Sequence, residues 1–388
     1  MLAALFLCFA AQDAKPEPKQ ERELRPANDV PATMTQEQAR AALERSLAFI
    51  TTSQNPDGSW CGSAPDSLME LGFSPETYYT WQLGAVELTL MALMQCEETP
   101  ERRASLEKGM QWFCTTRLPA RGDDWDVDYM WPSLYGVVCA VDALDDPRFA
   151  SPEWQKKIET RGREYMAILE RSQVPEGGWG YYDDPPFTNR PKWATSFATA
   201  TVLTSLEVAG KRGWYADPKL RDRAIAYVAG CALPNGAYEY DLNPIPRAGV
   251  GESINSVKGS LGRIQICNWS LRRCGIKTVT DDKLREGLES FFEHHRFLDV
   301  ARMRPVPHEA YYANAGYFYF FGHYYCALAI NELPAAEREA WHAKLRPHLV
   351  KCQYADGSTS DFLHSRYDIL ASTSYAAMAL DLGLAKAK

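Results

Sequence analysis

Two kinds of hydrophobic pattern alternate along this chain of 388 residues. The first kind is an amphipathic helix, with apolar residues at helical spacing on one face and charged residues on the other. It recurs over Thr35–Thr52, Arg161–Ser172, Leu220–Ala229, Lys283–Phe292 and Ala336–Lys351. The second kind is apolar on nearly all sides, and it follows over Trp81–Met94, Trp131–Leu144, Trp193–Val208, Ser256–Leu271, Tyr312–Asn331 and Ser372–Leu384. No segment shows the alternation of a half-buried strand, so the pattern predicts an all-α protein.

A short turn containing glycine follows four of the charged segments. The copies begin at Gln54 (QNPDGSW), Gln173 (QVPEGGW), Leu233 (LPNGAY) and Gln353 (QYADGS). They lie one or two intervals of about 60 residues apart, and weaker copies at Arg121–Trp125 and His294–Arg304 fill the missing intervals. Glycine supplies the positive φ that such a turn needs. The chain is therefore predicted to contain six repeats of one helix pair each.

Two helix classes that alternate six times predict two concentric layers. The charged helices would face water, and the apolar helices would be buried on most sides. The chain shows no distinctive capping units of the kind that an open solenoid needs at its ends. We therefore predict a closed (α/α)6 toroid, with an open solenoid of the same repeats as the alternative.

The glycine turns resemble the QW-type repeats of squalene–hopene cyclases and protein prenyltransferases. The resemblance rests on Gln54…Asp57-Gly58-Ser59-Trp60 and on Gln173…Gly177-Gly178-Trp179, and it covers the whole folded part of the chain. It implies the α/α toroid fold of the terpenoid cyclase and prenyltransferase superfamily. It does not imply one activity, because complement-type thioester domains share the toroid and a shared fold does not transfer chemistry.

An acidic cluster before the second apolar helix is the densest candidate for catalysis. Bacterial triterpene cyclases use an Asp-x-Asp-Asp motif to protonate an alkene, and Asp126-Val127-Asp128-Tyr129 matches its first and third positions. The resemblance implies Asp128 as the general acid and Asp126 as the carboxylate that organises it. Tyr129 replaces the last carboxylate of the motif, and acidic residues at a helix N-terminus also serve as ordinary caps.

Motifs for the other activities of the superfamily are absent from the sequence. The Asp-x-Cys pair of zinc prenyltransferases does not occur, so His364 lacks its partners, and the Gly-Cys-Gly-Glu-Gln thioester motif is missing. A His-x-x-x-His pair and a Gly-x-Ser-x-Gly elbow are also absent, which removes support for a metalloprotease or a serine hydrolase. The sequence thus predicts no metal site and no cofactor.

The fifth apolar segment is unusually aromatic and is predicted to face the centre of the ring. Tyr312, Tyr319 and His323 fall on one helical face, and Arg263 and His323 lie 60 residues apart at equivalent points of adjacent repeats. We expect these four residues and Trp131 to line a central cavity, where ring faces hold a cation or stack on a sugar. The alternatives are aromatic core packing and an arginine paired with a carboxylate.

The first 34 residues are predicted to lie outside the toroid. Residues 1–11 hold an apolar run that is too short to span a bilayer and that indicates a secretory signal peptide, with a frayed tail as the alternative. Residues 12–34, rich in proline and charge, are predicted to be a tether, and residues 35–388 the toroid. We expect an exported protein, periplasmic or extracellular, whose nine remaining cysteines need no disulfide.

The net charge of the chain mainly serves to exclude classes of ligand. The formal net charge is −8, so the chain lacks the basic surface that nucleic acid requires. No run is long and apolar enough for a membrane span. We therefore expect a small-molecule or lipid-like ligand, and the sequence identifies no protein partner.

Three functions fit this sequence. We predict a toroid that binds an apolar or mixed ligand in its central cavity, and the sequence establishes no reaction for it. The first alternative is a terpene cyclase-like enzyme with Asp128 as its acid. The second is an exported carbohydrate-active enzyme that uses carboxylates on the loops after the turns, such as Asp183, Asp184 and Glu239. Two carboxylates about 5–10 Å apart across an open groove would favour this second alternative.

Overall fold

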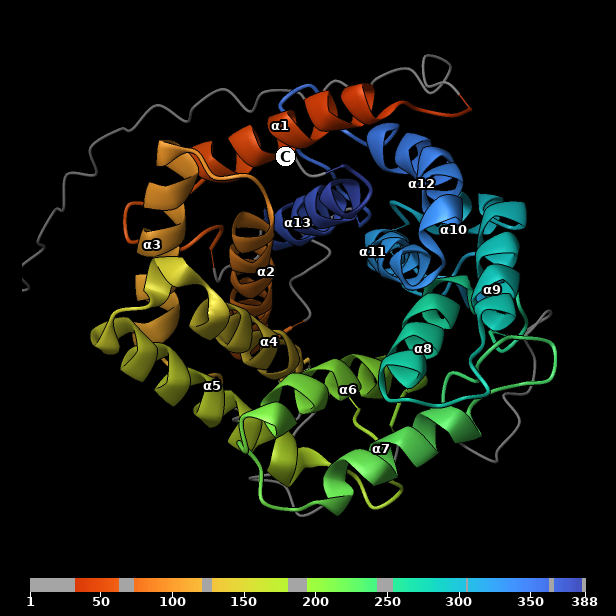
Figure 1. The fold of residues 1–388 in the computed structure, drawn as a ribbon, viewed down its shortest axis with the longest axis horizontal. Coiled ribbons are helices and arrows are strands. Elements are labelled where there is room, and N and C mark those ends of the chain that lie inside the picture. The colour runs from red at the N-terminus through yellow and green to blue at the C-terminus, as the bar shows by residue number, and fades with distance from the viewer. Residues whose placement is uncertain are drawn as a thin grey trace, which may run out of the picture.

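In a computed structural model, the chain folds into two concentric rings of helices (Figure 1). The structure describes residues 32–62, 73–120, 128–180, 194–242, 254–304, 306–362 and 366–385. The predicted signal peptide and most of the predicted tether lie outside these residues, as do Asp126 and His364. No helix among the described residues has the length and apolar character to cross a membrane.

The inner ring contains the nearly uncharged helices. They are α2 (Pro75–Gln95), α4 (Trp131–Asp145), α6 (Ser196–Lys211), α8 (Leu261–Arg273), α11 (Phe318–Glu332) and α13 (Arg366–Leu382). Each inner helix packs against the next one, and α13 packs against α2. The contact between the last and the first inner helix closes the ring, which confirms the predicted toroid and excludes the open solenoid.

The outer ring contains the charged helices. They are α1 (Gln36–Thr52), α3 (Pro100–Thr115), α5 (Pro152–Ser172), α7 (Lys219–Gly230), α9 (Asp281–Glu293) and α12 (Ala335–Val350). The connections between helices contain the short helix α10 (Arg296–Ala301) and the 3-10 turns η3 (Pro147–Phe149) and η4 (Tyr311–Ala313). Threonine or serine caps several outer helices, as Thr35 caps α1 and Thr280 caps α9 through a backbone N–H. Such caps stabilise a helix by about 1 kcal/mol each.

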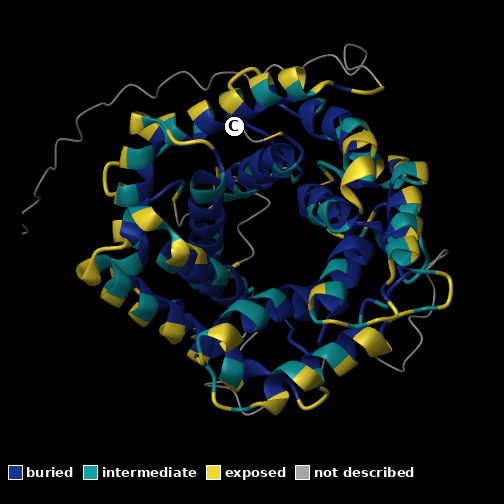
Figure 2. Cartoon of the chain, viewed as in Figure 1, coloured by how far each residue is buried: buried dark blue, intermediate teal, exposed yellow. Residues whose placement is uncertain are grey.

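Burial separates the two rings as the charge pattern predicts (Figure 2). Helix α2 is buried almost without interruption from Thr77 to Leu93, whereas α9 buries one face around Leu284, Leu288 and Phe291. The cysteines from Cys61 to Cys352 that the structure describes are free thiols. The core is therefore the apolar layer between the two rings, without disulfides among the described residues.

The glycine turns connect neighbouring outer helices. Gly58 has a φ of +96°, and Gln54 Nε2 donates to its carbonyl (3.0 Å) and to the carbonyl of Ser105 on α3 (2.9 Å). Gln173 makes the same pair of bonds, to Gly177 (2.8 Å) and to Leu220 on α7 (2.9 Å). The turn residues thus hold the outer ring together, which is a structural role.

Several helices begin at other residues than the sequence predicts. Helix α5 starts at Pro152, nine residues before the predicted Arg161, because Ser151 caps it through the backbone N–H of Trp154. Helix α11 starts at Phe318 instead of Tyr312, because Tyr312 has a φ of +59° and interrupts the helical path. These shifts decide which aromatic side chains face the centre.

Candidate active site

A cavity of about 710 Å³ lies between the N-terminal halves of the inner helices. Small-molecule sites usually measure about 300–1,000 Å³. Most of its wall is aromatic, because the inner helices carry large rings where they meet the axis of the toroid. The rings include Trp81 on α2, Trp131 and Tyr135 on α4, Phe197 on α6, Phe318 and Phe321 on α11, and Tyr375 on α13.

Few polar side chains other than tyrosine reach this cavity. Among the described residues of the wall they are Asp128, His308, Asp361, Asp368 and Ser372. His308 donates from Nδ1 to the carbonyl of Ala313 (2.7 Å), and the Tyr317 hydroxyl lies 2.9 Å from its Nε2. Because a carbonyl only accepts, His308 carries a proton on Nδ1.

Asp128 lies immediately before α4 and borders the cavity. Trp81 donates its indole N–H to Oδ2 (2.7 Å), and Trp131 donates its own to Oδ1 (3.2 Å). The φ of Asp128 is +60°, a value that few residues other than glycine adopt. Burial raises the pKa of Asp128, and the two indole donors oppose this rise because they favour the ionised form.

The second acidic group is a pair of carboxyls, Asp361 and Asp368, at the start of α13. Asp361 accepts hydrogen bonds from the backbone N–H of Phe320 (3.0 Å) and from the Ser372 hydroxyl (3.1 Å). Asp368 accepts one from the Ser360 hydroxyl (2.6 Å) and one from the backbone N–H of Phe362 (3.2 Å). The Ser372 hydroxyl also lies 3.5 Å from Asp368 Oδ1, so it bridges the two residues. Both are buried, with 3% and 9% of their surface exposed.

The surroundings of this pair favour the protonated form of its carboxyls. Burial raises the pKa of both groups, and the two side chains are also hydrogen-bonded to each other. The rise is larger for Asp368, because the negative charge of Asp361 adds to the effect of burial. Donors around Asp361, with the charge of Arg302, favour its anion. Two carboxyls in contact oppose each other's ionisation, so this arrangement favours the protonated form of Asp368 more than that of Asp361.

The structure places the residues predicted from sequence in two groups. Asp128 and Trp131 lie in the cavity wall, 3.2 Å apart through their hydrogen bond. Asp126 lies outside the described residues, so its position next to Asp128 stays a prediction. Arg263, Tyr312, Tyr319 and His323 are absent from the described wall, which corrects the predicted lining.

Three of these four residues serve other purposes close to the wall. Arg263 is buried behind it, with its guanidinium 5.2 Å from the centre of the Tyr240 ring and hydrogen bonds to backbone carbonyls. The Tyr312 hydroxyl lies 3.0 Å from Lys258 Nζ. Tyr319 donates its hydroxyl to the carbonyl of His348 on the outer ring (2.9 Å). The face of α11 that we expected to point inward points toward the outer ring instead.

Sequence reasoning missed the two carboxyls Asp361 and Asp368 in the cavity wall. The only signal was their place in the last repeat, directly after the glycine turn at Gly357. Carboxylates in such loops are usually solvated, so nothing in the sequence distinguishes this pair. Asp361 is held in place by a backbone N–H from α11, that of Phe320.

No protein-family model matches this chain, and no curated protein matches it. Solved structures match it in fold. The apo type II terpene cyclase MstE from Scytonema aligns with a TM-score of 0.52 at 12% identity, over 90% of this chain and 98% of the cyclase. MstE has also been solved in complex with geranylgeranyl dihydroxybenzoate as its substrate.

Two neighbours carry names from carbohydrate chemistry. A possible member of the GH105 family from Klebsiella pneumoniae aligns with a TM-score of 0.53 at 10% identity, over 97% of this chain and 98% of that one. A β-1,3-1,4-glucanase from Paenibacillus aligns with a TM-score of 0.52 at 9% identity, over 92% and 96%. At these identities the likeness shows the α/α toroid fold alone and no activity.

Proposed function

We propose that this protein is an acid-initiated enzyme, similar in type to a terpene cyclase, that protonates an apolar unsaturated ligand in its central cavity. The observation that carries the proposal is the buried Asp361–Asp368 pair in a largely aromatic wall, where burial and the charge of Asp361 raise the pKa of Asp368. Asp368 is the proton donor, and Asp361 is the neighbour that keeps it protonated. This assignment replaces Asp128, the acid that the sequence resemblance implies.

The proposed step moves one proton and one electron pair. Asp368 gives its proton to one carbon of a C=C bond, whose π electrons form the new C–H bond. The other carbon becomes a cation, and Asp368 becomes a carboxylate. Ring faces such as those of Trp131 and Phe318 attract the cation by about 0.5–2 kcal/mol each. The cycle ends when the cation loses a proton or captures water, and Asp368 is protonated again.

The wall favours an apolar ligand over a sugar. A sugar presents many hydroxyl groups, and a site that binds it must satisfy them with hydrogen bonds. Few polar side chains of the described wall are available, and those of Asp361 and Asp368 already bond to each other and to serines. The carboxyls of this pair are also closer than the separation of about 5 Å or more that glycosidases use.

The test follows the transferred proton. The purified full chain is incubated in D₂O with geranylgeranyl dihydroxybenzoate, the substrate of MstE, as the probe. We expect an isomerised or cyclised product that carries one deuterium on carbon. Asp368→Asn should abolish the label. The control is Asp282, whose carboxylate lies on the exposed surface of α9, so Asp282→Asn should keep the label.

Two outcomes would overturn the proposal. A probe that binds but is recovered unchanged and unlabelled from the wild-type protein would identify a binding protein without chemistry. An equal label in Asp368→Asn and wild type would place the acid elsewhere, with Asp128 as the next variant to make.

We further propose that the protein is exported. The support is the apolar run at residues 1–11 followed by the proline-rich segment at 12–34. Mass determination of the protein from its own host should give a chain that lacks the first residues. A chain that begins at Met1 would contradict export by this signal.

A further inference from the structure

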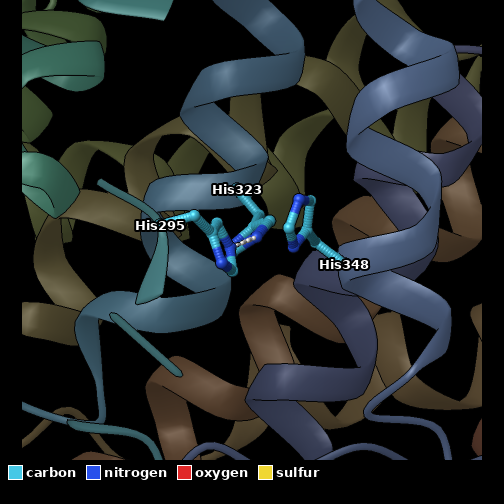
Figure 3. Close-up of side chains that lie close together, drawn as sticks. All are labelled: His295, His323 and His348. Carbon is cyan, nitrogen blue, oxygen red and sulfur yellow. Dashed lines mark hydrogen bonds between the residues drawn. The ribbon is translucent and has the colours of Figure 1, made fainter. Parts of the chain in front are cut away.

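Three histidines from different helical segments meet between the rings (Figure 3). His295 precedes α10, His323 lies on α11, and His348 lies on α12. One ring nitrogen from each lies within 4.8 Å of the other two. His295 and His323 are buried, with 3% and 0% of their surface exposed, and His348 is half-buried. None of the three borders the central cavity.

Hydrogen bonds fix the proton of two of these rings. His323 Nδ1 lies 2.6 Å from the backbone carbonyl of Tyr319, which only accepts, so the ring carries its proton on Nδ1. His295 Nδ1 lies 3.0 Å from a carboxylate oxygen of Asp299. That carboxylate is ionised, since it also forms an ion pair with Lys351 at 2.5 Å. His295 therefore carries its proton on Nδ1 as well.

The two remaining nitrogens point at each other without a proton. His295 Nε2 and His323 Nε2 lie 2.9 Å apart, and the tautomers above leave a lone pair on each. Two lone pairs at this distance repel unless a cation lies between them. A further proton would create a buried imidazolium in a cluster that already contains the ammonium group of Lys351. A metal ion instead uses both lone pairs.

We propose that His295, His323 and His348 form a site for a divalent transition metal ion, with Zn²⁺ as the best match. Neutral imidazoles are ligands for zinc, copper, iron and nickel, and zinc accepts three histidines with one open position. Zinc–nitrogen bonds of about 2.0–2.1 Å place two ligand nitrogens about 3.4 Å apart. The pair at 2.9 Å needs to open by only about 0.5 Å for such bonds.

The surroundings have the features of a metal site's outer shell. The Asp299–His295 contact and the carbonyl on His323 are the partners that usually orient metal-bound histidines. The rings of Phe291 and Tyr319 cover the cluster, with centres 5.0 and 4.3 Å from that of His323. They exclude water and support a low coordination number.

His348 is the ligand that must move. Its ring stacks on that of His295, with centres 3.6 Å apart and planes tilted by 33°. Lys351 Nζ lies 3.3 Å from its Nδ1. His348 is the one half-buried ring of the three, so it has room to turn toward the other two. The ammonium group of Lys351 repels a metal ion, so a variant that removes this charge is expected to bind metal more tightly.

A metal here would act on the fold of the last two repeats. It would join the end of α9, inner helix α11 and outer helix α12, and so add to contacts such as the hydrogen bond from the Tyr319 hydroxyl to the carbonyl of His348. Helix α10 follows His295 directly, and the segment after it supplies Val306 and His308 to the cavity wall. The ion would therefore hold one side of the cavity in place without contacting its ligand.

The test measures metal binding by the full chain. After dialysis against a chelator, Zn²⁺ is added and followed by titration calorimetry, and Co²⁺ is added and followed by its visible spectrum. We expect one high-affinity ion per chain and a rise in the thermal midpoint of roughly 2–4 °C at saturating zinc. The cobalt spectrum should show nitrogen ligands without a sulfur charge-transfer band, which separates this site from the free cysteines.

Four variants test whether zinc binds at these three histidines. His348→Ala should weaken zinc binding at least about tenfold, and His323→Gln should abolish it. Lys351→Met should strengthen binding, because it removes the opposing charge. His294 lies next to the cluster but is not part of it, so His294→Ala should bind zinc like the wild type. Circular dichroism shows whether each variant is folded.

Two results would overturn the site. Without stoichiometric zinc binding by the folded wild-type chain, the two nitrogens share a proton and the cluster is ordinary packing. Equal zinc affinity in wild type, His348→Ala and His323→Gln would place any bound zinc elsewhere.

Discussion

The cavity contains two kinds of acidic site, and they differ in what surrounds the carboxyl oxygens. Asp128 accepts an indole N–H on each oxygen, from Trp81 and Trp131. Asp368 instead shares its surroundings with a second carboxyl, that of Asp361. N–H donors stabilise a carboxylate, whereas a neighbouring carboxylate stabilises a protonated acid. Similar burial in one cavity thus produces two groups with different chemical roles.

The difference shows why burial alone does not identify a general acid. Burial raises the pKa of Asp128 and of Asp368, but only Asp368 has an anion beside it that adds to the rise. The two indole donors oppose this rise and favour the anion of Asp128, so under the proposed function its role is to attract the developing cation. The proposed proton transfer therefore assigns the donor to the pair and an electrostatic role to Asp128.

The largest expected effect separates the two sites by activity. Asp368→Asn should lower the turnover of a deuterium-labelled product about 10²- to 10⁴-fold, because general acids contribute this much. Its amide replaces the protonated carboxyl in shape and still donates to Asp361, so binding of the probe and the fold should persist. Asp128→Asn should reduce turnover far less. An equal loss in both variants would contradict the distinction between the sites.

The next largest effect distinguishes Asp128 from Asp368 by the stability of their asparagine variants. Asp128→Asn turns one hydrogen-bond acceptor into an N–H₂ donor that faces an indole N–H. The unsatisfied donors should lower the free energy of unfolding by about 1–3 kcal/mol. Asp368→Asn should lower it by less, so the order of the two variants is reversed relative to activity. Urea unfolding followed by tryptophan fluorescence measures both, and a common order in the two assays would refute the comparison.

The fold was predictable because every repeat carries the same local sequence pattern. Charged and uncharged helices alternate, and the glycine at Gly58, Gly177, Gly236 and Gly357 has the positive φ that its turn predicts. The site was predictable only where one motif lies at the start of one helix, as for Asp128 and Trp131. An inner helix such as α11 is buried on all sides, so its sequence does not tell which face meets the cavity.

The rest of the chemistry depends on contacts between distant segments. Asp361, one member of the carboxyl pair, is held by the backbone N–H of Phe320, which lies 41 residues away in the sequence. The histidines at 295, 323 and 348 belong to three segments and form no motif, so the sequence predicted no metal where we now propose one. Side-chain clusters of this kind follow from the packing of the ring and not from local spacing.

A smaller effect appears in the dependence of stability on pH. The unfolded chain releases the proton of Asp368 near the ordinary value of 3.8, whereas the folded chain keeps it to higher pH. Between these two values the folded state binds more protons, so the free energy of unfolding should fall as pH rises, by at most about 1.4 kcal/mol per pH unit. Burial also raises the pKa of Glu87 and of Asp142, the latter to about 7, so these groups contribute a slope of the same sign. Asp368→Asn should therefore make the slope smaller, without removing it, when unfolding is measured in buffers from pH 4 upward. An unchanged slope in the variant would assign the proton to another group.

The smallest expected effect tests the support of Asp128 alone. Trp81→Phe keeps an aromatic ring in the wall and removes the indole N–H that lies 2.7 Å from Asp128 Oδ2. Loss of this hydrogen bond should lower the free energy of unfolding by about 1 kcal/mol. It should also raise the pKa of Asp128 further, because one of the two groups that favour its anion is gone. Turnover should stay within a few-fold of the wild type, since the proposed proton comes from Asp368. A loss of turnover as large as that of Asp368→Asn would show instead that Asp128, held by Trp81, is the acid that starts the reaction.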